Sequence, residues 1–171
     1  MKLVIRWKKG RDGPHALVCT REDGSTTVQH TSHQFFPFHD LTHYAVETVL
    51  GHRMGFYGLV AAGWDLTDFG NPWPRGRLPS GMDPSELIVG QMDIEKATGV
   101  EVNANLLNDH VRAWLSENAP SQSPGRAVSD ADLAAIRSLC ATLHEQWLAL
   151  EPGHTMELVF SADAPANEEA S

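Results

Sequence analysis

The amino-acid sequence predicts an α+β fold, in which an antiparallel sheet of three N-terminal strands and one C-terminal strand carries four or five helices on one face. In the first 30 residues and again at 156–160, apolar residues alternate with polar ones, which is the period of a half-buried strand. Between these regions, apolar residues recur every three or four positions, which is typical of helices. Strands at both ends of a helical middle favour separate layers for the two kinds of element.

The expected N-terminal strands are short and are joined by turn-forming residues. Alternation over 3–8 predicts the first strand, and a run of apolar residues at 16–20 predicts the second. The Asp-Gly pair at 23–24 predicts a tight hairpin into a third strand at 26–30, because both residues tolerate a positive φ. The strand at 156–160 should pair with an N-terminal strand, since an isolated strand leaves its backbone groups unpaired.

The middle of the chain should be helical, with loops at glycine and proline. Asp83, Pro84 and Glu86 have the spacing of a helix N-cap followed by a capping box. Ser129 and Asp132 have the spacing of a second one. The expected helices are one from Pro37 to Gly51, a short buried one within 55–63, one over 83–98, one that places Leu106, Leu107, His110, Val111, Trp114 and Leu115 on one face, and one over 129–150.

Length and composition suit one globular domain with an acidic balance. We expect a single domain at 1–161, followed by a disordered acidic tail at 162–171. A net charge of −9 disfavours non-specific binding to nucleic acid or to anionic membranes. Because no apolar run is long enough for a signal peptide or a membrane span, we expect a cytoplasmic protein. Cys19 and Cys140 are expected to be buried free thiols.

Most of the polar chemistry of the chain lies in the segment HDLTHYAVE at 39–47. On a helix with about 100° per residue, His39, His43 and Glu47 fall within about 80°, and Asp40 lies about 100° from His39. The rest of the circumference is apolar, so we expect the helix to be buried and this polar stripe to face an internal pocket. A metal ion satisfies several buried imidazoles and carboxylates together. His39 and His43, four residues apart, are therefore the candidate metal ligands.

The pattern His39-Asp40-x-x-His43 resembles the His-Glu-x-x-His motif of zinc metalloproteases. The resemblance implies zinc held by His39 and His43, with Asp40 in the place of the proton-handling glutamate but one methylene shorter. Glu47 lies about 12 Å along the helix axis from His39, so we expect it to support His43 rather than share the ion with both histidines. Asp40 and Glu47 are the candidate catalytic residues.

The His39-Asp40 doublet also resembles that of the metal-dependent phosphohydrolases of the HD superfamily. In that family the doublet lies in an all-helical domain, with another histidine on an earlier helix. Here the residues before His39 are expected to form strands, and His30 or His33 would have to take the place of that histidine.

The sequence leaves the third metal ligand open. His110 and His144 lie on apolar helix faces, where a histidine is more often a hydrogen-bonded core residue than a ligand. His30 and His33 precede the stripe and could fold back onto it or lie in a solvated loop. The other candidates are carboxylates whose ordinary role is solvation or helix capping, namely Asp65, Asp68, Glu86 and Asp93.

A loop rich in proline and glycine at 71–81 carries Trp73, Arg75 and Arg77. These residues could clamp an anionic substrate, or the two arginines could simply be solvated. The sequence contains no phosphate-binding glycine loop, dinucleotide fingerprint or Gly-x-Ser-x-Gly nucleophile elbow.

Together these observations predict a small metal-dependent enzyme, and within that class a hydrolase. A divalent ion, zinc by the resemblance above, would lower the pKa of a bound water that attacks a polarised bond of a small-molecule substrate. The alternative is a non-enzymatic binding or interaction protein, in which the stripe is a structural hydrogen-bond network and the loop at 70–82 contacts a partner.

Overall fold

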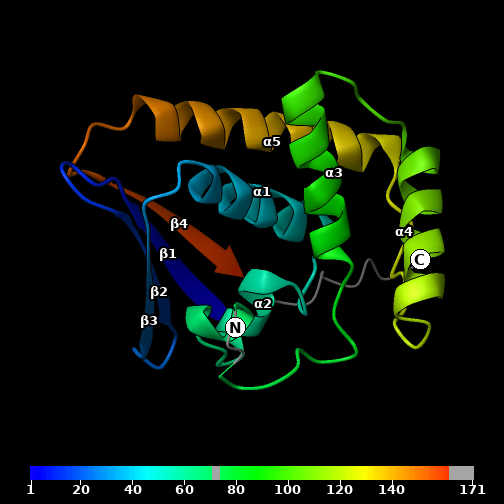
Figure 1. The fold of residues 1–171 in the computed structure, drawn as a ribbon, viewed down its shortest axis with the longest axis horizontal. Helices are drawn as coiled ribbons and strands as arrows, with labels where there is room; N and C mark the ends of the chain where they lie inside the picture. Colours follow the sequence, from blue (N-terminus) through cyan, green and yellow to red (C-terminus); the bar gives the residue numbers. More distant parts are fainter. Residues whose placement is uncertain (71–73, 162–171) are drawn as a thin grey trace, which may run out of the picture.

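The sheet contains four antiparallel strands in the order β3-β2-β1-β4 (Figure 1). The structure is a computed structural model that describes residues 1–70 and 74–161, so the predicted tail at 162–171 lies outside the described residues. The strands are β1 (Lys2–Lys8), β2 (His15–Arg21), β3 (Thr26–Thr31) and β4 (Thr155–Ser161). The N-terminal meander and the late fourth strand are arranged as the alternation predicts.

Strand β4 completes the sheet by pairing with β1 over its whole length, from Lys2 opposite Ser161 to Lys8 opposite Thr155. This pairing confirms the prediction for 156–160. The inward residues of β4 are Met156 and Phe160, which are buried, and Leu158, which is half-buried against the core. The inward residues of β1 are all buried, namely Leu3, Ile5 and Trp7.

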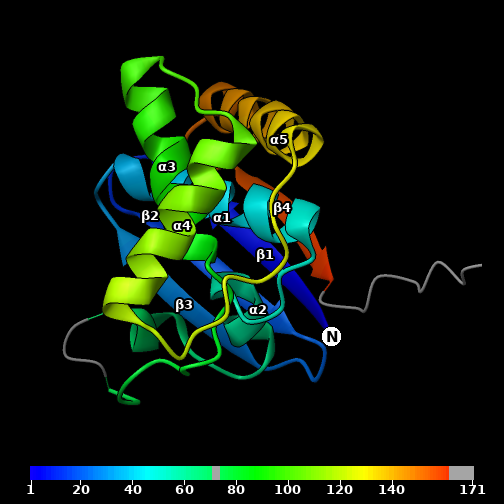
Figure 2. The ribbon, with the colours of Figure 1, turned by 90° about the vertical axis from the view of Figure 1, so that its right-hand side faces the viewer.

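Five α-helices and one 3-10 turn account for the helical part of residues 1–70 and 74–161. They are α1 (Phe35–Leu50), α2 (Phe56–Ala61), the turn η1 (Leu66–Phe69), α3 (Ser85–Thr98), α4 (Ala104–Asn118) and α5 (Asp130–Ala149). Helix α1 lies between the sheet and α5 (Figure 1), and α3 and α4 lie at the end of this layer (Figure 2). The α+β fold is confirmed.

Helix α1 is the central helix because most of its circumference is apolar, as the sequence predicts. Leu41, Ala45 and Val46 are fully buried. The helix ends at Gly51, whose φ of 67° lies in the left-handed region that favours glycine, and its backbone N–H donates to the carbonyl of Glu47. The polar residues of α1 are therefore held in a rigid, buried element.

The predicted capping box at Asp83 and Glu86 is wrong. Helix α3 begins at Ser85, and the side chain of Asp83 accepts from the backbone N–H groups of Arg53 and Met54, at 2.8 and 2.7 Å. Glu86 is therefore free to point away from the helix end. The predicted box at Ser129 and Asp132 is present in α5.

Helix α4 buries a narrower face than the sequence predicts. Ala104, Leu107, Val111 and Leu115 form its buried row. The residues one position earlier are exposed, namely Leu106, His110 and Trp114. A three-and-four spacing fits both rows, and packing against α3 decides between them.

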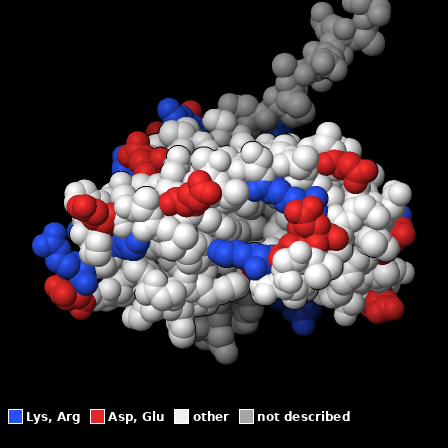
Figure 3. Space-filling model, turned by 90° about the horizontal axis from the view of Figure 1, so that it is seen from above, with Lys and Arg blue, Asp and Glu red and all other residues white. Residues whose placement is uncertain are grey.

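The surface seen from the α5 side carries acidic and basic side chains in small mixed groups rather than one continuous basic patch (Figure 3). Within the described residues, none of the helices combines the length and the apolar character that crossing a bilayer requires.

Candidate metal centre

The imidazole of His43 lies between two carboxylates from different elements. Its Nδ1 is 3.1 Å from Oε1 of Glu47, one turn along α1, and its Nε2 is 3.0 Å from Oε2 of Glu86 in the first turn of α3. His43 and Glu47 are almost fully buried, whereas the side chain of Glu86 is 70% exposed. The exposed carboxylate therefore reaches from α3 to a histidine buried in α1.

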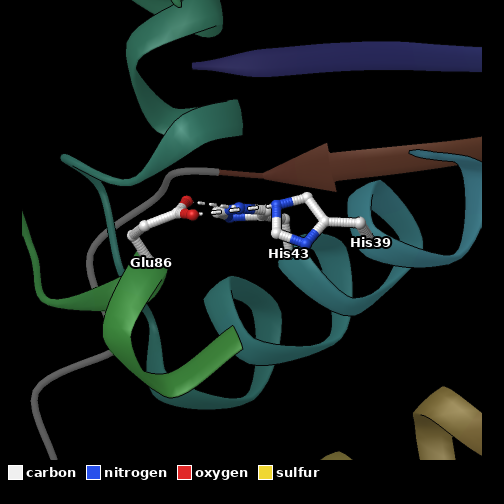
Figure 4. A group of neighbouring side chains, drawn as sticks. All are labelled: His39, His43 and Glu86. Carbon is white, nitrogen blue, oxygen red and sulfur yellow. Dashed lines mark hydrogen bonds and ion pairs between the residues drawn. The ribbon is translucent and has the colours of Figure 1, made fainter. Parts of the chain in front are cut away.

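His39 repeats this arrangement one turn earlier in α1. Its Nδ1 is 2.7 Å from Oδ2 of Asp93 in α3, and its Nε2 is 3.8 Å from Oε1 of Glu86. His39, His43 and Glu86 form a group whose possible ligand atoms all lie within 4.8 Å of one another (Figure 4). We call this group the candidate metal centre.

The histidines are oriented as metal ligands usually are. Each presents Nε2 to Glu86, and each has its Nδ1 held by another carboxylate, which fixes the ring and raises the basicity of Nε2. Around a tetrahedral zinc ion, with bonds of about 2.0–2.1 Å, neighbouring ligand atoms lie about 3.3 Å apart. The separations of Glu86 from the histidines, 3.0 and 3.8 Å, bracket this value, so each histidine lies at a distance from Glu86 that suits a shared zinc ion.

Glu47 is held in place from both ends. One oxygen faces His43, and the other accepts from the backbone N–H groups of Tyr57 and Gly58, at 3.0 and 3.2 Å. Gly55 packs so closely that a Cβ there would lie 2.5 Å from the Glu47 carboxyl carbon. Glu47 is therefore placed to position His43, as expected, and it does not line the pocket described below.

Asp40 lies beside the candidate metal centre, on the wall of the same pocket. Burial raises the pKa of its carboxyl to about 6, and the neighbouring imidazoles of His43 and His39 oppose this rise. No described residue forms a hydrogen bond with its side chain. A carboxylate that is buried, unpartnered and poised near neutral pH is suited to accept and return a proton.

The surroundings of His43 favour positive charge. Burial alone would lower its pKa, but hydrogen bonds with Glu47 and Glu86 outweigh this effect and raise the pKa to about 10. The same contact with His43 lowers the pKa of Glu86. A metal ion bound to Nε2 of His43 would have to replace this proton, and it would then face the same carboxylates.

A cavity of about 920 Å³ opens beside the candidate metal centre. His39, Asp40 and His43 of α1 form one wall, and the inner face of the sheet contributes Trp7 and Gln29. The remaining walls come from the α2–η1 region and from the segment between residues 74 and 86. The prediction that the polar stripe faces a pocket is thus confirmed for its two histidines, whereas Glu47 lies behind them.

The other histidines proposed as ligands lie elsewhere. His110 is exposed on α4, and His30 and His33 are exposed before α1. His144 of α5 faces the carbonyl oxygen of Phe38, 3.1 Å from its Nε2. None of the four belongs to the candidate metal centre.

Two of the proposed carboxylates have capping roles. Asp65 and Asp68 form a capping box around η1, so neither is available to the candidate metal centre.

The arginines of the proline-rich loop do not line the pocket. The guanidinium of Arg75 lies over the ring of Trp64, at 4.7 Å, and donates to the carbonyl of Gly63. Arg77 is exposed. Trp73, the third residue of the proposed clamp, lies outside the described residues.

Sequence reasoning did not single out Glu86 and Asp93 from the other carboxylates. Both lie on α3, 43 and 54 residues from their histidine partners. Their separation of seven residues places them on the same helix face, two turns apart, which was the available signal. Its spacing from Asp83 assigned Glu86 to a capping box instead, so this shared face was not used.

No known protein family, curated protein or solved structure matches this chain.

Proposed function

We propose that the protein is a metal-dependent hydrolase with zinc bound by His39, His43 and Glu86. The observation that carries the proposal is the convergence of His39, His43 and Glu86, whose possible ligand atoms lie within 4.8 Å of one another, with both Nδ1 atoms held by further carboxylates. Three protein ligands leave one position of a tetrahedral ion open for water or substrate, as in catalytic zinc sites.

Each residue has a distinct role in this proposal. The ion would polarise the substrate and lower the pKa of water at the open position. Asp40 would accept the proton of that water and later return it to the leaving group, because its carboxylate shares the pocket and has no described hydrogen-bond partner. Glu47 and Asp93 would position His43 and His39.

Zinc titration of purified protein, with metal content measured by mass spectrometry, tests the metal site. We expect one zinc ion per chain, lost in His39→Ala, His43→Ala and Glu86→Gln. His110→Ala and Glu145→Gln are matched controls, because both residues are exposed and lie outside the candidate metal centre. Wild-type protein that binds no zinc would refute the proposal.

Asp40→Asn tests the catalytic role separately. The variant should retain zinc but lose about 100-fold or more of its hydrolytic rate on ester and anilide probes, since it cannot accept a proton. Asp12→Asn, at an exposed position, is the control. An Asp40→Asn variant with full activity would remove Asp40 from the mechanism.

The alternative, a binding or interaction protein, is favoured by one specific observation. The residues of the two histidine sites already contact one another in a chain of hydrogen bonds, apart from a longer step of 3.8 Å between Glu86 and His39. In order, the chain is Glu47, His43, Glu86, His39 and Asp93. In that case each histidine substitution should cost about 1–3 kcal/mol of stability through unsatisfied buried groups. Thermal melting with and without a chelator separates the two functions, because a purely structural network is indifferent to the chelator.

The proposed location is the cytoplasm. Cys19 and Cys140 are both free and buried, which supports a reducing compartment. Burial raises the pKa of their thiols to about 12 and 11, so neither is suited to act as a nucleophile.

A further inference from the structure

Large parts of the pocket walls are apolar, and one of them lies directly against the candidate metal centre, since the rings of Phe56 and His43 have centroids 5.3 Å apart. Six large apolar side chains contribute to them, namely Phe36, Phe56, Leu66, Phe69, Leu78 and Met82. Phe56 and Phe69 contact each other edge to face, with ring centroids 4.8 Å apart, and so form a continuous aromatic surface. A cavity of about 920 Å³ is large enough for a drug-sized molecule.

The charges around the pocket are negative. Asp40 and Glu86 line it, and Glu47 and Asp93 lie directly behind the two histidines. No described lysine or arginine lines the cavity. A zinc ion would take the place of the proton on His43, and the four carboxylates around it would outweigh its two positive charges. A phosphate or carboxylate group on a substrate would then meet net repulsion, with no described lysine or arginine on the wall to offset it.

From this lining we propose that the substrate is an uncharged amide or ester carrying a bulky apolar group, and that the apolar group occupies the wall formed by Phe56 and Phe69. This inference rests on the proposed hydrolase function and names its substrate class. The carbonyl group of an amide or ester is polar without being charged, so it can approach the ion without bringing a second anion among the carboxylates.

The reaction balances with water as the only co-reactant. The water oxygen bonds to the carbonyl carbon while Asp40 accepts the water proton. The bond between the carbonyl carbon and the leaving nitrogen or oxygen then breaks, and Asp40 returns the proton to that atom. The products are a carboxylic acid and an amine or alcohol. No oxidation or reduction occurs.

The experiment compares three probes by calorimetric titration of zinc-loaded and metal-free protein. N-acetylphenylalaninamide is uncharged and aromatic, N-acetylglycinamide is uncharged without an apolar side chain, and phenyl phosphate is aromatic and anionic. We expect N-acetylphenylalaninamide to bind about tenfold or more tightly than either other probe, since burial of its benzyl group is favourable. Equal or tighter binding of phenyl phosphate or N-acetylglycinamide would overturn the inference.

A charge placed on the pocket wall gives a second, independent readout. Gln29 on β3 lines the pocket, whereas His30, the next residue, lies on the opposite face of the strand. Gln29→Lys should tighten binding of phenyl phosphate about threefold to tenfold through the added cation, and His30→Lys should not. Identical effects of both substitutions would show that phenyl phosphate binds outside the pocket, which overturns the inference.

Zinc titration of the same samples separates this inference from the proposed function. Absence of zinc binding refutes the hydrolase, whatever the probes do. Zinc binding together with a preference for phenyl phosphate refutes only the substrate class.

Discussion

Histidines lie on two sides of helix α1, His39 and His43 of α1 itself toward α3 and His144 of α5 on the other side, and the two sides differ in the charge of the histidines' partners. Toward α3, the rings of His39 and His43 face carboxylates at every nitrogen. Toward α5, the Nε2–H of His144 donates to the carbonyl of Phe38, and its Nδ1 accepts from the ammonium group of Lys96, at 3.3 Å. Burial and Lys96 lower the pKa of His144, whereas the pKa of His43 is raised.

The partners of a buried histidine, rather than its burial, decide whether it can bind a cation. His144 also borders a cavity, of about 240 Å³, but Lys96 and the Phe38 carbonyl occupy both of its nitrogens. Carboxylates contact the rings of His39 and His43, and their negative charge favours a cation at these rings. The ring of His144 already contacts a cation, the ammonium group of Lys96.

The largest expected effect is the gain in stability on zinc binding, which should depend on His39 and not on His144. With free zinc about 1,000-fold above its dissociation constant, the wild-type protein should gain about 4 kcal/mol of stability. For a chain of this size this raises Tm by about 8–16 °C. His39→Ala should abolish the rise and His144→Ala should preserve it, as measured by thermal melting. If His144→Ala alone abolished the rise in Tm, zinc would bind at His144 and not at the candidate metal centre.

A methyl group added at Gly55 tests how tightly the neighbouring residues pack around the carboxyl group of Glu47. Its Cβ would lie 2.5 Å from the carboxyl carbon of Glu47 and 2.6 Å from Oγ of Ser85. Gly55→Ala should therefore cost about 3 kcal/mol in urea denaturation. Gly90→Ala in α3 is the control, because no heavy atom lies near its added Cβ, and it should stabilise by about 0.5–1 kcal/mol. Equal stability of the two variants would contradict the packing described for Glu47.

The carboxyl of Asp40 should make the metal-free protein less stable as the pH rises. Its pKa is raised by burial from 3.8 to about 6, so its full contribution to stability is present below about pH 4 and is lost as the pH rises through about 6. Asp40→Asn should thus be up to about 3 kcal/mol more stable than wild type at pH 8 and equally stable near pH 4. Denaturation at both pH values checks this, and a variant less stable than wild type at pH 8 would contradict it.

The smallest expected effect lies on the side toward α5, at Arg137. Its guanidinium donates to both carboxylate oxygens of Glu95 and to the carbonyl of Val102. Arg137→Ala should cost about 1–2 kcal/mol, because Glu95 is buried and would lose its partner. Zinc affinity should not change. A loss of zinc in this variant would mean that the two sides of α1 are coupled.

Periodicity predicted the parts of this protein that depend on one segment at a time. The four strands, the burial of α1 and the stop at Gly51 follow from local alternation, spacing and backbone preference. His39 and His43 could be paired from the sequence because four residues along a helix fix their distance. The pocket beside them followed from the apolar remainder of the same helix.

The partners from α3 could not be predicted, because their position depends on how two helices pack. Glu86 follows Asp83 by three residues, which is also the spacing of a capping box, and nothing local distinguishes the two roles. The hydrogen bonds from Arg53 and Met54 to Asp83 decide the matter, since they engage the presumed cap elsewhere. For a similar reason the predicted buried face of α4 is too wide, since of its residues only Leu107, Val111 and Leu115 are buried.

The position of β1 between β2 and β4 has a consequence for how the molecule folds. Arg6 and Glu157 form an ion pair across neighbouring strands although 151 residues separate them. Contacts so distant along the chain slow folding, since a long loop must close before they contribute. During synthesis the sheet cannot be completed until residues 155–161 have left the ribosome. Until then β1 lacks the partner strand with which it pairs from Lys2 to Lys8.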